Sequence, residues 1–142
     1  MTVSRYWRHL KSADFAEIDR EDTVVILPLA AIEQHGPHLT LDVDLRINEG
    51  ILSAVVERAP DNLPFVILPS QSIGYSAEHE AFPGTLSYPP STLIDHWTTT
   101  VAQAAALGFR RFILFNSHGG NSDLMRIAVR ELRVHYDVLA VA

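Results

Sequence analysis

Four short apolar runs with β-branched residues constrain most strongly what this chain can fold into. Each run is continuous rather than alternating, which is typical of strands buried on both faces of a parallel sheet. Helical patterns and one long loop separate the runs, in the order strand, helix, strand, loop, helix, strand, helix, strand. This order predicts an α/β fold built on a mostly parallel sheet. The runs cover residues 23–29, 65–68, 111–115 and 138–141.

Three segments between the runs have the spacing of α-helices. In the first, apolar residues recur at every fourth position from Ile47 to Val55, with Leu52 and Val56 beside them, and the helix is expected to end before Pro60. The second is expected to have Ser91 as its N-cap and to stop at Gly108. The third starts near Asn121 or Ser122, and the residues expected on the apolar faces of the second and third helices are Ile94, Trp97, Val101, Ala105, Met125, Ala128, Val129 and Leu132.

The composition is that of a folded globular protein and argues against several classes of function. Of the 142 residues, 47% are apolar and 20% are charged, which predicts a single folded domain. The net charge of −6 and the scattered Lys and Arg residues argue against a nucleic-acid partner. The lack of cysteine excludes disulfides and thiolate metal ligands. No apolar stretch has the length of a membrane span and residues 1–20 lack the apolar core of an export signal, so a cytoplasmic protein without a membrane partner is expected.

A polar stretch after the first predicted strand contains several groups able to hold a metal ion or a proton. Glu33 and His35 are two residues apart, so an extended backbone points both side chains in the same direction. A turn at Gly36 and Pro37 follows. Taken alone, this stretch is equally consistent with an ordinary polar loop. The groups in question are Glu33, His35, His38, Asp42 and Asp44.

A second polar loop, residues 116–121, follows the third predicted strand. Ligands of an open parallel sheet bind beyond the carboxyl ends of its strands, so both loops are expected at the same edge. His118 would then join Glu33, His35 and Asp44 in a set of two histidines and two carboxylates. Imidazole and carboxylate, without thiolate, suit zinc, manganese or iron(II). The second loop therefore favours a metal site over an ordinary polar loop.

Three segments resemble motifs of the creatininase (creatinine amidohydrolase) family, in the order in which that family carries them. Residues 28–39, PLAAIEQHGPHL, together with Asp44 are similar to the first metal motif. Residues 78–85, EHEAFPGT, match the family's His-x-x-Phe-Pro-Gly-Thr stretch. Residues 116–121, NSHGGN, resemble its Asn-Gly-His-Gly-Gly-Asn motif, with Ser117 in place of a glycine. The resemblance covers nearly the whole chain.

The resemblance implies a three-layer α/β/α metal-dependent amidohydrolase that assembles as a homo-oligomer such as a hexamer. It implies hydrolysis of a small non-peptide or formamide-type C–N bond by a metal-bridged water. Members act on creatinine, on a formamide of a flavin or deazaflavin precursor, or on a peptide intermediate of cofactor maturation. By position, Glu33 and His118 would hold one of two divalent ions (zinc, manganese or iron), His35 would hold the second, and Asp44 would bridge them.

Two further histidines are candidates for supporting roles in catalysis. His38 is expected to orient a metal ligand through a hydrogen bond. His79 either contacts the small-molecule amide substrate or pins the turn at residues 82–85. The residues interpreted as surface or packing positions are His9, His96, His135, Trp7, Trp97 and the solvated loop acid Asp42.

The sequence departs from the family at one expected metal ligand. Creatininase proper takes this ligand from a glutamate two residues after the loop histidine, where this chain has Gly120. Members with a Gly-Gly loop bring a glutamate from a later segment that resembles His-Ala-Gly-Glu-x-Glu-Thr-Ser, and residues 1–142 contain no such segment. The expectation is therefore a C-terminally truncated member, with residues 1–142 as the N-terminal portion of a single creatininase-like domain. Gly120 also argues against creatinine itself as the substrate.

The alternative is a catalytically inactive α/β protein that acts by binding or assembling with a partner. In either case the strand at residues 138–141 would drive association, because an unpaired strand edge invites pairing. Catalysis would require the missing segment or ligands from another subunit. A serine-nucleophile hydrolase is disfavoured, because the sequence has no Gly-x-Ser-x-Gly motif.

Overall fold

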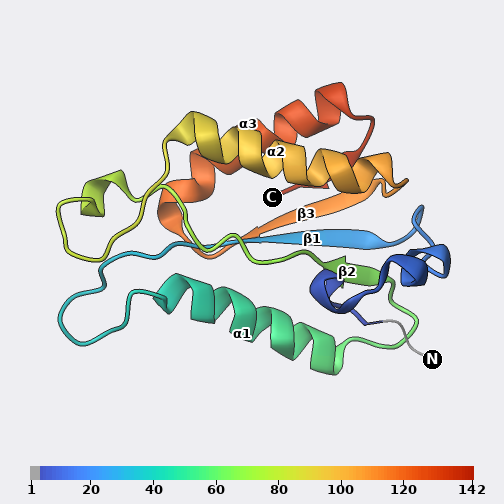
Figure 1. Cartoon of the computed structure of the whole chain (residues 1–142), viewed down its shortest axis with the longest axis horizontal. Helices are drawn as coiled ribbons and strands as arrows, with labels where there is room; N and C mark the ends of the chain where they lie inside the picture. Colours follow the sequence, from blue (N-terminus) through green and yellow to red (C-terminus); the bar gives the residue numbers. More distant parts are fainter. Residues whose placement is uncertain (1–3) are drawn as a thin grey trace.

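A parallel sheet in the strand order β2-β1-β3-β4 forms the centre of the molecule in a computed structural model, which describes residues 4–142 (Figure 1). All three strand pairs are parallel. The parallel α/β sheet predicted from the apolar runs is therefore confirmed, with strand ends that differ from the prediction by one residue. The strands are β1 (Val24–Leu29), β2 (Phe65–Ile67), β3 (Arg111–Asn116) and β4 (Leu139–Val141).

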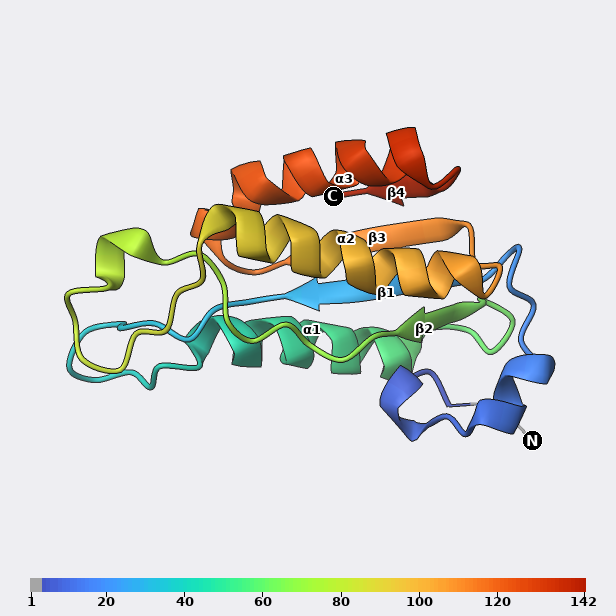
Figure 2. The ribbon, with the colours of Figure 1, turned by 45° about the horizontal axis from the view of Figure 1, so that its top comes forward.

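Helices cover both faces of the sheet and give a three-layer arrangement (Figures 1 and 2). Helix α1 (Val43–Arg58) lies on one face, and α2 (Pro90–Ala106) and α3 (Ser122–His135) lie side by side on the other. Short 3-10 turns complete the fold at Trp7–His9, Ser12–Ala16, Ala77–His79 and Gly119–Asn121. No helix within residues 4–142 combines the length and the apolar character that crossing a membrane requires.

The larger part of the core lies between the sheet and the α2–α3 layer. Trp97 on α2 is fully buried against strand residues, together with Phe109 and Phe112. A smaller cluster on the α1 side contains Ile26, Leu52, Phe65 and Ile67. Strands β1 and β2 are thus buried on both faces, which explains why they are continuous apolar runs, whereas Leu139 and Val141 of β4 are exposed.

Helix α1 turns a different face to the sheet from the one its apolar spacing suggests. Its buried residues are Asp44, Asn48 and Leu52, spaced four apart. Ile47 and Ile51, which marked the helix in the sequence, are 49% and 46% exposed. Two of the three buried positions are polar because this stripe faces the site described below. Of the apolar residues that marked the helix, Leu52 and Val56 pack toward the sheet, whereas the Ile47–Ile51–Val55 stripe does not.

The start of α2 also differs from the prediction. Pro90 occupies the first position of the helix and Pro89 is the N-cap, whereas Ser91 was expected as the cap. Proline is favoured at this first position for two reasons. An N–H there would have no acceptor within the helix, so its absence costs nothing, and the φ of proline is already helical. At the other end of the helix, Gly108 adopts a φ of 107° as predicted for a terminating glycine.

The long loop between β2 and α2 crosses the carboxyl edge of the sheet. It makes one isolated bridge from Gln71 to Leu29, the last residue of β1, and another from Leu86 to Ile32, just after β1. In Figure 1 this loop and the loop that precedes α1 extend together beyond the same end of the strands. Three loops, after β1, β2 and β3, therefore meet at one edge.

Candidate metal centre

The loops after β1 and β3 start from paired positions on neighbouring strands. Leu29 and Asn116, the last residues of the two strands, are opposite each other in the register. The N–H of Ser117 donates to the carbonyl of Leu29 at 3.1 Å. The prediction that both loops leave the sheet at one edge is confirmed, although about ninety residues separate them.

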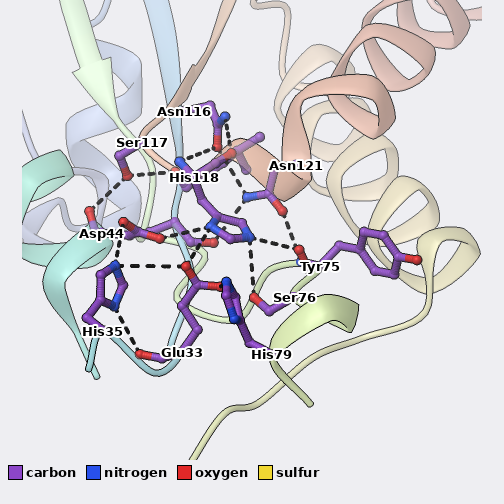
Figure 3. Close-up of polar contacts among 12 residues, drawn as sticks. Glu33, His35, Asp44, Tyr75, Ser76, His79, Asn116, Ser117, His118 and Asn121 are labelled. Carbon is purple, nitrogen blue, oxygen red and sulfur yellow. Dashed lines mark hydrogen bonds and ion pairs between the residues drawn. The ribbon is translucent and has the colours of Figure 1, made fainter. Parts of the chain in front are cut away.

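Glu33, His35 and Asp44 meet beyond this edge (Figure 3). One ligand atom from each lies within 4.8 Å of the other two. His35 Nε2 is 3.5 Å from Asp44 Oδ1 and 3.9 Å from Glu33 Oε1. The N–H of Glu33 donates to the carbonyl of Leu41 at 3.0 Å, which closes the loop and brings the first turn of α1 back toward Glu33.

His118 joins this group from the β3 side. Its Nδ1 lies 2.9 Å from Asp44 Oδ2 and 3.4 Å from Glu33 Oε1. The structure therefore brings together all four residues that the sequence assigned to the site. Asp44 turns one carboxylate oxygen toward each histidine, Oδ1 toward His35 and Oδ2 toward His118.

Each of the two histidines has an outer ring nitrogen beside a backbone carbonyl and an inner ring nitrogen beside the carboxylates. His118 Nε2 lies 2.8 Å from the carbonyl of Tyr75, and His35 Nδ1 lies 3.1 Å from the carbonyl of Glu33. A carbonyl only accepts, so a neutral ring that donates to it carries a lone pair on its inner nitrogen, and at His118 this inner nitrogen is 2.9 Å from the Asp44 carboxylate, which also only accepts. Lone pairs that face carboxylate oxygens repel them unless a proton or a cation lies between. This arrangement is the one that metal-ligating histidines adopt.

The two carboxylates are buried without a permanent positive partner. Glu33 is 6% and Asp44 is 7% exposed. Within residues 4–142 their ion pairs are with histidines alone, and Glu33 Oε2 has no hydrogen-bond partner. Two buried carboxylates side by side are costly unless a cation compensates them. The donor set therefore fits divalent metal, with ligand types that suit zinc, manganese or iron.

A buried hydrogen-bond network joins the first turns of α1, which carry Asp44, to the ends of β1 and β3. The side-chain amide of Asn48 donates to the carbonyls of Leu29 and Phe115 at 2.9 and 3.0 Å. Ser117 Oγ donates to the carbonyl of Asp44 at 2.8 Å. Asn48 was not anticipated from the sequence, although its place four residues after Asp44 puts it on the same helix stripe.

A second network supports His118 and the loop beside it. Asn121 donates to the carbonyl of Ala30 at 3.1 Å and accepts from the N–H of Tyr75 at 3.0 Å. The Ser76 hydroxyl lies 3.3 Å from His118 Nε2. These contacts were not predicted, because they depend on where the loop after β2 crosses the sheet edge.

Gly120 is closed to any side chain. A Cβ at this position would lie 2.0 Å from the carbonyl oxygen of Tyr75 and 2.7 Å from His118 Nε2. The backbone passes so close to its neighbours that only glycine fits. Position 120 therefore supplies no metal ligand, in agreement with the sequence, and the structure adds the steric reason.

The other polar residues of the first loop lie outside the cluster. His38 is exposed, and its side chain has no hydrogen bond or ion pair with the described residues 4–142, so its expected role in orienting a metal ligand stays a prediction. Asp42 pairs with Arg46 at 2.8 Å. Hydrogen bonds from Thr40 and then Arg46 lower the pKa of Asp42, which is the solvated acid that the sequence suggested.

The remaining interpretations from the sequence agree with the structure. His9, His96 and His135 are exposed. Trp97 is buried in the core, and Trp7 packs against Phe15 and Phe109.

Comparison with known proteins places this site in a family. The family model for creatininase, creatinine amidohydrolase, matches residues 8–142. The chain is 38% identical over 112 residues to the mycofactocin precursor peptide peptidase of Mycolicibacterium smegmatis, covering 78% of this chain and 45% of that protein. It is 32% identical over 127 residues to the creatinine amidohydrolase of Pseudomonas putida, covering 83% of this chain and 47% of that protein. The chain thus spans about half the length of the curated relatives it matches.

Solved creatininase structures share the fold. A manganese creatininase superposes with a TM-score of 0.80 at 28% identity, over 98% of this chain and 58% of that one. A zinc–zinc form of a creatininase mutant gives a TM-score of 0.79 at 29% identity, with the same coverage. With the family model matching nearly its whole length, the chain belongs to the creatininase family.

Proposed function

We propose that this chain is the metal-binding part of a metal-dependent amidohydrolase that hydrolyses a small non-peptide or formamide-type C–N bond. One observation carries the proposal. His35 and His118 each direct a ring nitrogen at buried carboxylates that have no lysine or arginine partner within residues 4–142. The family relationship supports it, since the relatives include a creatinine amidohydrolase and a peptide peptidase.

We carry the ligand assignment over from the resemblance to the family, and the orientation of Asp44 supports it. Its two carboxylate oxygens face different histidines, which supports a bridging role between two ions. Glu33 and His118 would hold one ion, and His35 the other. When bound, two such ions would lower the pKa of a shared water and polarise the carbonyl of an amide.

The residues around the cluster determine how a substrate approaches. His118 and Asp44 close the site on the side of the sheet, with side chains only 6% and 10% exposed. The side chain of His35 is 21% exposed, so the cluster opens toward solvent on that side. A small amide would enter there and place its carbonyl over Glu33 and His35. Because Gly120 stands where creatininase proper has a glutamate, we propose a formamide-type amide rather than creatinine.

We further propose a cytoplasmic homo-oligomer, such as a hexamer. An apolar stripe on α1 that includes Ile47, Ile51 and Val55 is exposed and would be covered in such an assembly. A neighbouring subunit could also complete the coordination of the second ion.

A catalytically inactive protein that assembles with a partner is the alternative, and the coordination of the second ion favours it. Within residues 4–142 only His35 and the shared Asp44 are assigned to that ion, and Gly120 has no room for a further ligand. Such a protein would bind one ion tightly and the second weakly.

Hydrolysis of a panel of amides by the zinc-loaded and manganese-loaded chain tests the proposed activity. The panel contains formylated arylamines, short peptides and creatinine, with Asp44→Asn as the inactive control. Metal-dependent turnover of one amide that is lost in the control supports the proposal. Equal background rates for both proteins on every amide would support the alternative.

A further inference from the structure

His79 is the third histidine beside the buried carboxylates, and it belongs to the long loop between β2 and α2 (Figure 3). Its Nε2 lies 3.9 Å from Glu33 Oε2, which is beyond hydrogen-bond length. The side chain is 31% exposed, more than that of any other residue paired with Glu33. His79 therefore lies on the side of the cluster that a substrate would reach.

Gln34 determines which way its own amide points. Gln34 Oε1 accepts a hydrogen bond from the N–H of Gly36 at 3.0 Å. A backbone N–H only donates, so the amide oxygen must face Gly36 and the amide nitrogen must face the opposite way. That nitrogen lies 2.9 Å from His79 Nδ1.

The orientation of Gln34 fixes the tautomer of His79. An amide nitrogen only donates, so His79 Nδ1 accepts its hydrogen bond. A neutral imidazole whose Nδ1 accepts carries its proton on Nε2. The nitrogen of His79 that faces Glu33 is therefore an N–H donor, and no acceptor within residues 4–142 lies within hydrogen-bond distance of it.

The surrounding loops hold both residues in this arrangement. The backbone N–H of Gln34 donates to Thr85 Oγ1 at 3.1 Å, which joins the loop after β1 to the loop that carries His79. The N–H of Phe82 donates to the carbonyl of His79 at 3.0 Å, and the two rings pack edge to face at 6.3 Å. His79 thus holds the turn that contains Phe82, and its contacts with Phe82 and Gln34 fix the orientation of its ring.

His79 differs in this respect from the two proposed metal ligands. The outer nitrogens of His35 and His118 lie beside backbone carbonyls, which only accept, so a neutral ring that donates there can present the lone pair of its inner nitrogen to a cation. The outer nitrogen of His79 accepts, so its inner nitrogen holds a proton and has no lone pair for a metal. His79 is therefore not the missing fifth ligand.

We propose that His79 Nε2–H is a hydrogen-bond donor to the substrate, and that Gln34 is the positioning residue that keeps it in the donating tautomer. The inference rests on the proposed function. The donor would bind the carbonyl oxygen of the amide and stabilise the negative charge that develops on it during attack. An amide substrate suits the site because its carbonyl oxygen accepts such a bond. The carbonyl carbon that would be attacked is bonded to that oxygen.

The tautomer can be measured without any metal or substrate. In a chain labelled with 15N-histidine, long-range 1H–15N spectra distinguish a ring protonated on Nε2 from one protonated on Nδ1. His79→Gln removes one set of signals and thereby assigns it. We expect Nε2 protonation in the parent, and a shift toward the Nδ1 form in Gln34→Met, which keeps the volume and loses the amide. A parent ring protonated on Nδ1 would overturn the inference.

Ligand binding tests the role of the donor. Acetohydroxamate, which presents a carbonyl oxygen to metal centres, is titrated into the zinc-loaded parent after its zinc content has been counted. His79→Phe keeps the packing on Phe82 and removes the donor, so its affinity should fall about five- to tenfold with unchanged zinc content. His79→Gln should recover part of the affinity, because its amide nitrogen can occupy the position of Nε2.

The outcomes separate this inference from the proposed function. Unchanged affinity in His79→Phe, or loss of zinc from that variant, would overturn the donor role while the metal centre stands. A parent chain that binds no zinc would overturn the proposed function first, and the donor role would fall with it.

Discussion

The two sides of the candidate metal centre are built in different ways. The inner side is anchored in β3, α1 and the turn before α3, and its side chains are largely buried. The outer side lies on the loops after β1 and β2, and it is open to solvent. The inner side consists of Asp44, Asn48, Ser117, His118 and Gly120, and the outer side of Gln34, His35, His38 and His79.

Substitutions on the two sides should therefore differ in how much they change folding stability and how much they change ligand binding. Each inner residue is buried or closely packed, so a change there should cost folding free energy as well as metal binding. Outer residues are partly exposed, so a change there should affect ligands with little cost to the fold. Four substitutions test this division, in order of decreasing effect on the free energy of unfolding.

Gly120→Ala should have the largest effect. Its Cβ would lie 2.0 Å from the carbonyl oxygen of Tyr75, so the backbone must shift. We expect a loss of roughly 3 kcal/mol in the free energy of unfolding, measured by urea denaturation. Gly119→Ala is the matched control, because a Cβ there meets nothing within 4 Å. Equal stability of the two variants would show that the inner side is not tightly packed.

Asn48→Ala should be the next most destabilising. The side-chain amide is fully buried and donates to the carbonyls at the ends of β1 and β3. Its removal takes one buried hydrogen bond from each of these carbonyls, at a cost of about 2 kcal/mol, although the Leu29 carbonyl still accepts from the N–H of Ser117. Arg46→Ala, on the exposed face of the same helix, should change stability by less than about 0.5 kcal/mol. The comparison uses thermal unfolding of the metal-free proteins, and an Asn48 variant as stable as the Arg46 variant would contradict this role.

Ser117→Ala should have an intermediate effect. It removes the hydroxyl that donates to the carbonyl of Asp44 at the start of α1. We expect a loss of about 1 kcal/mol in stability and weaker zinc binding, because Asp44 loses part of its support. Calorimetric titration with zinc measures the second effect. Tighter zinc binding in the variant would mean that Ser117 strains the site rather than supporting it.

His35→Ala should leave the stability of the metal-free protein almost unchanged, within about 0.5 kcal/mol. Its ring is partly exposed and its hydrogen bond is to a carbonyl two residues away. The variant should nevertheless lose one of two bound ions in elemental analysis. His38→Ala, which alters an exposed residue of the same loop, should retain both ions. If the His38 variant lost metal as well, the outer side would have a role that its geometry does not show.

Much of the fold follows from the sequence because the apolar runs are long and continuous. The patterns at residues 23–29 and 111–115 are typical of buried parallel strands. The carboxyl ends of these strands bring Glu33 and His118 to the same edge. The face of α1 could not be predicted, because the buried stripe begins with Asp44 and Asn48 and the exposed stripe is apolar. Hydrophobic spacing identifies the core face only where no functional site occupies it.

The candidate ligands were predictable, but their hydrogen-bonding states were not. Residue type and spacing indicate that Glu33, His35, Asp44 and His118 can meet. Which nitrogen of each histidine faces inward depends on backbone carbonyls and on Gln34, and these contacts exist only in the folded chain. The same is true of Tyr75, whose backbone carbonyl both orients His118 and excludes a side chain at Gly120.

The most direct test of the central claim is the amount of transition metal bound per chain, measured by elemental analysis of the purified protein beside its His118→Ala variant. We expect close to two ions per chain in the parent and a clear reduction in the variant, because His118 Nδ1 faces both carboxylates. Little or no metal in the parent, with the same amount in the variant, would contradict the assignment of this cluster as a metal centre.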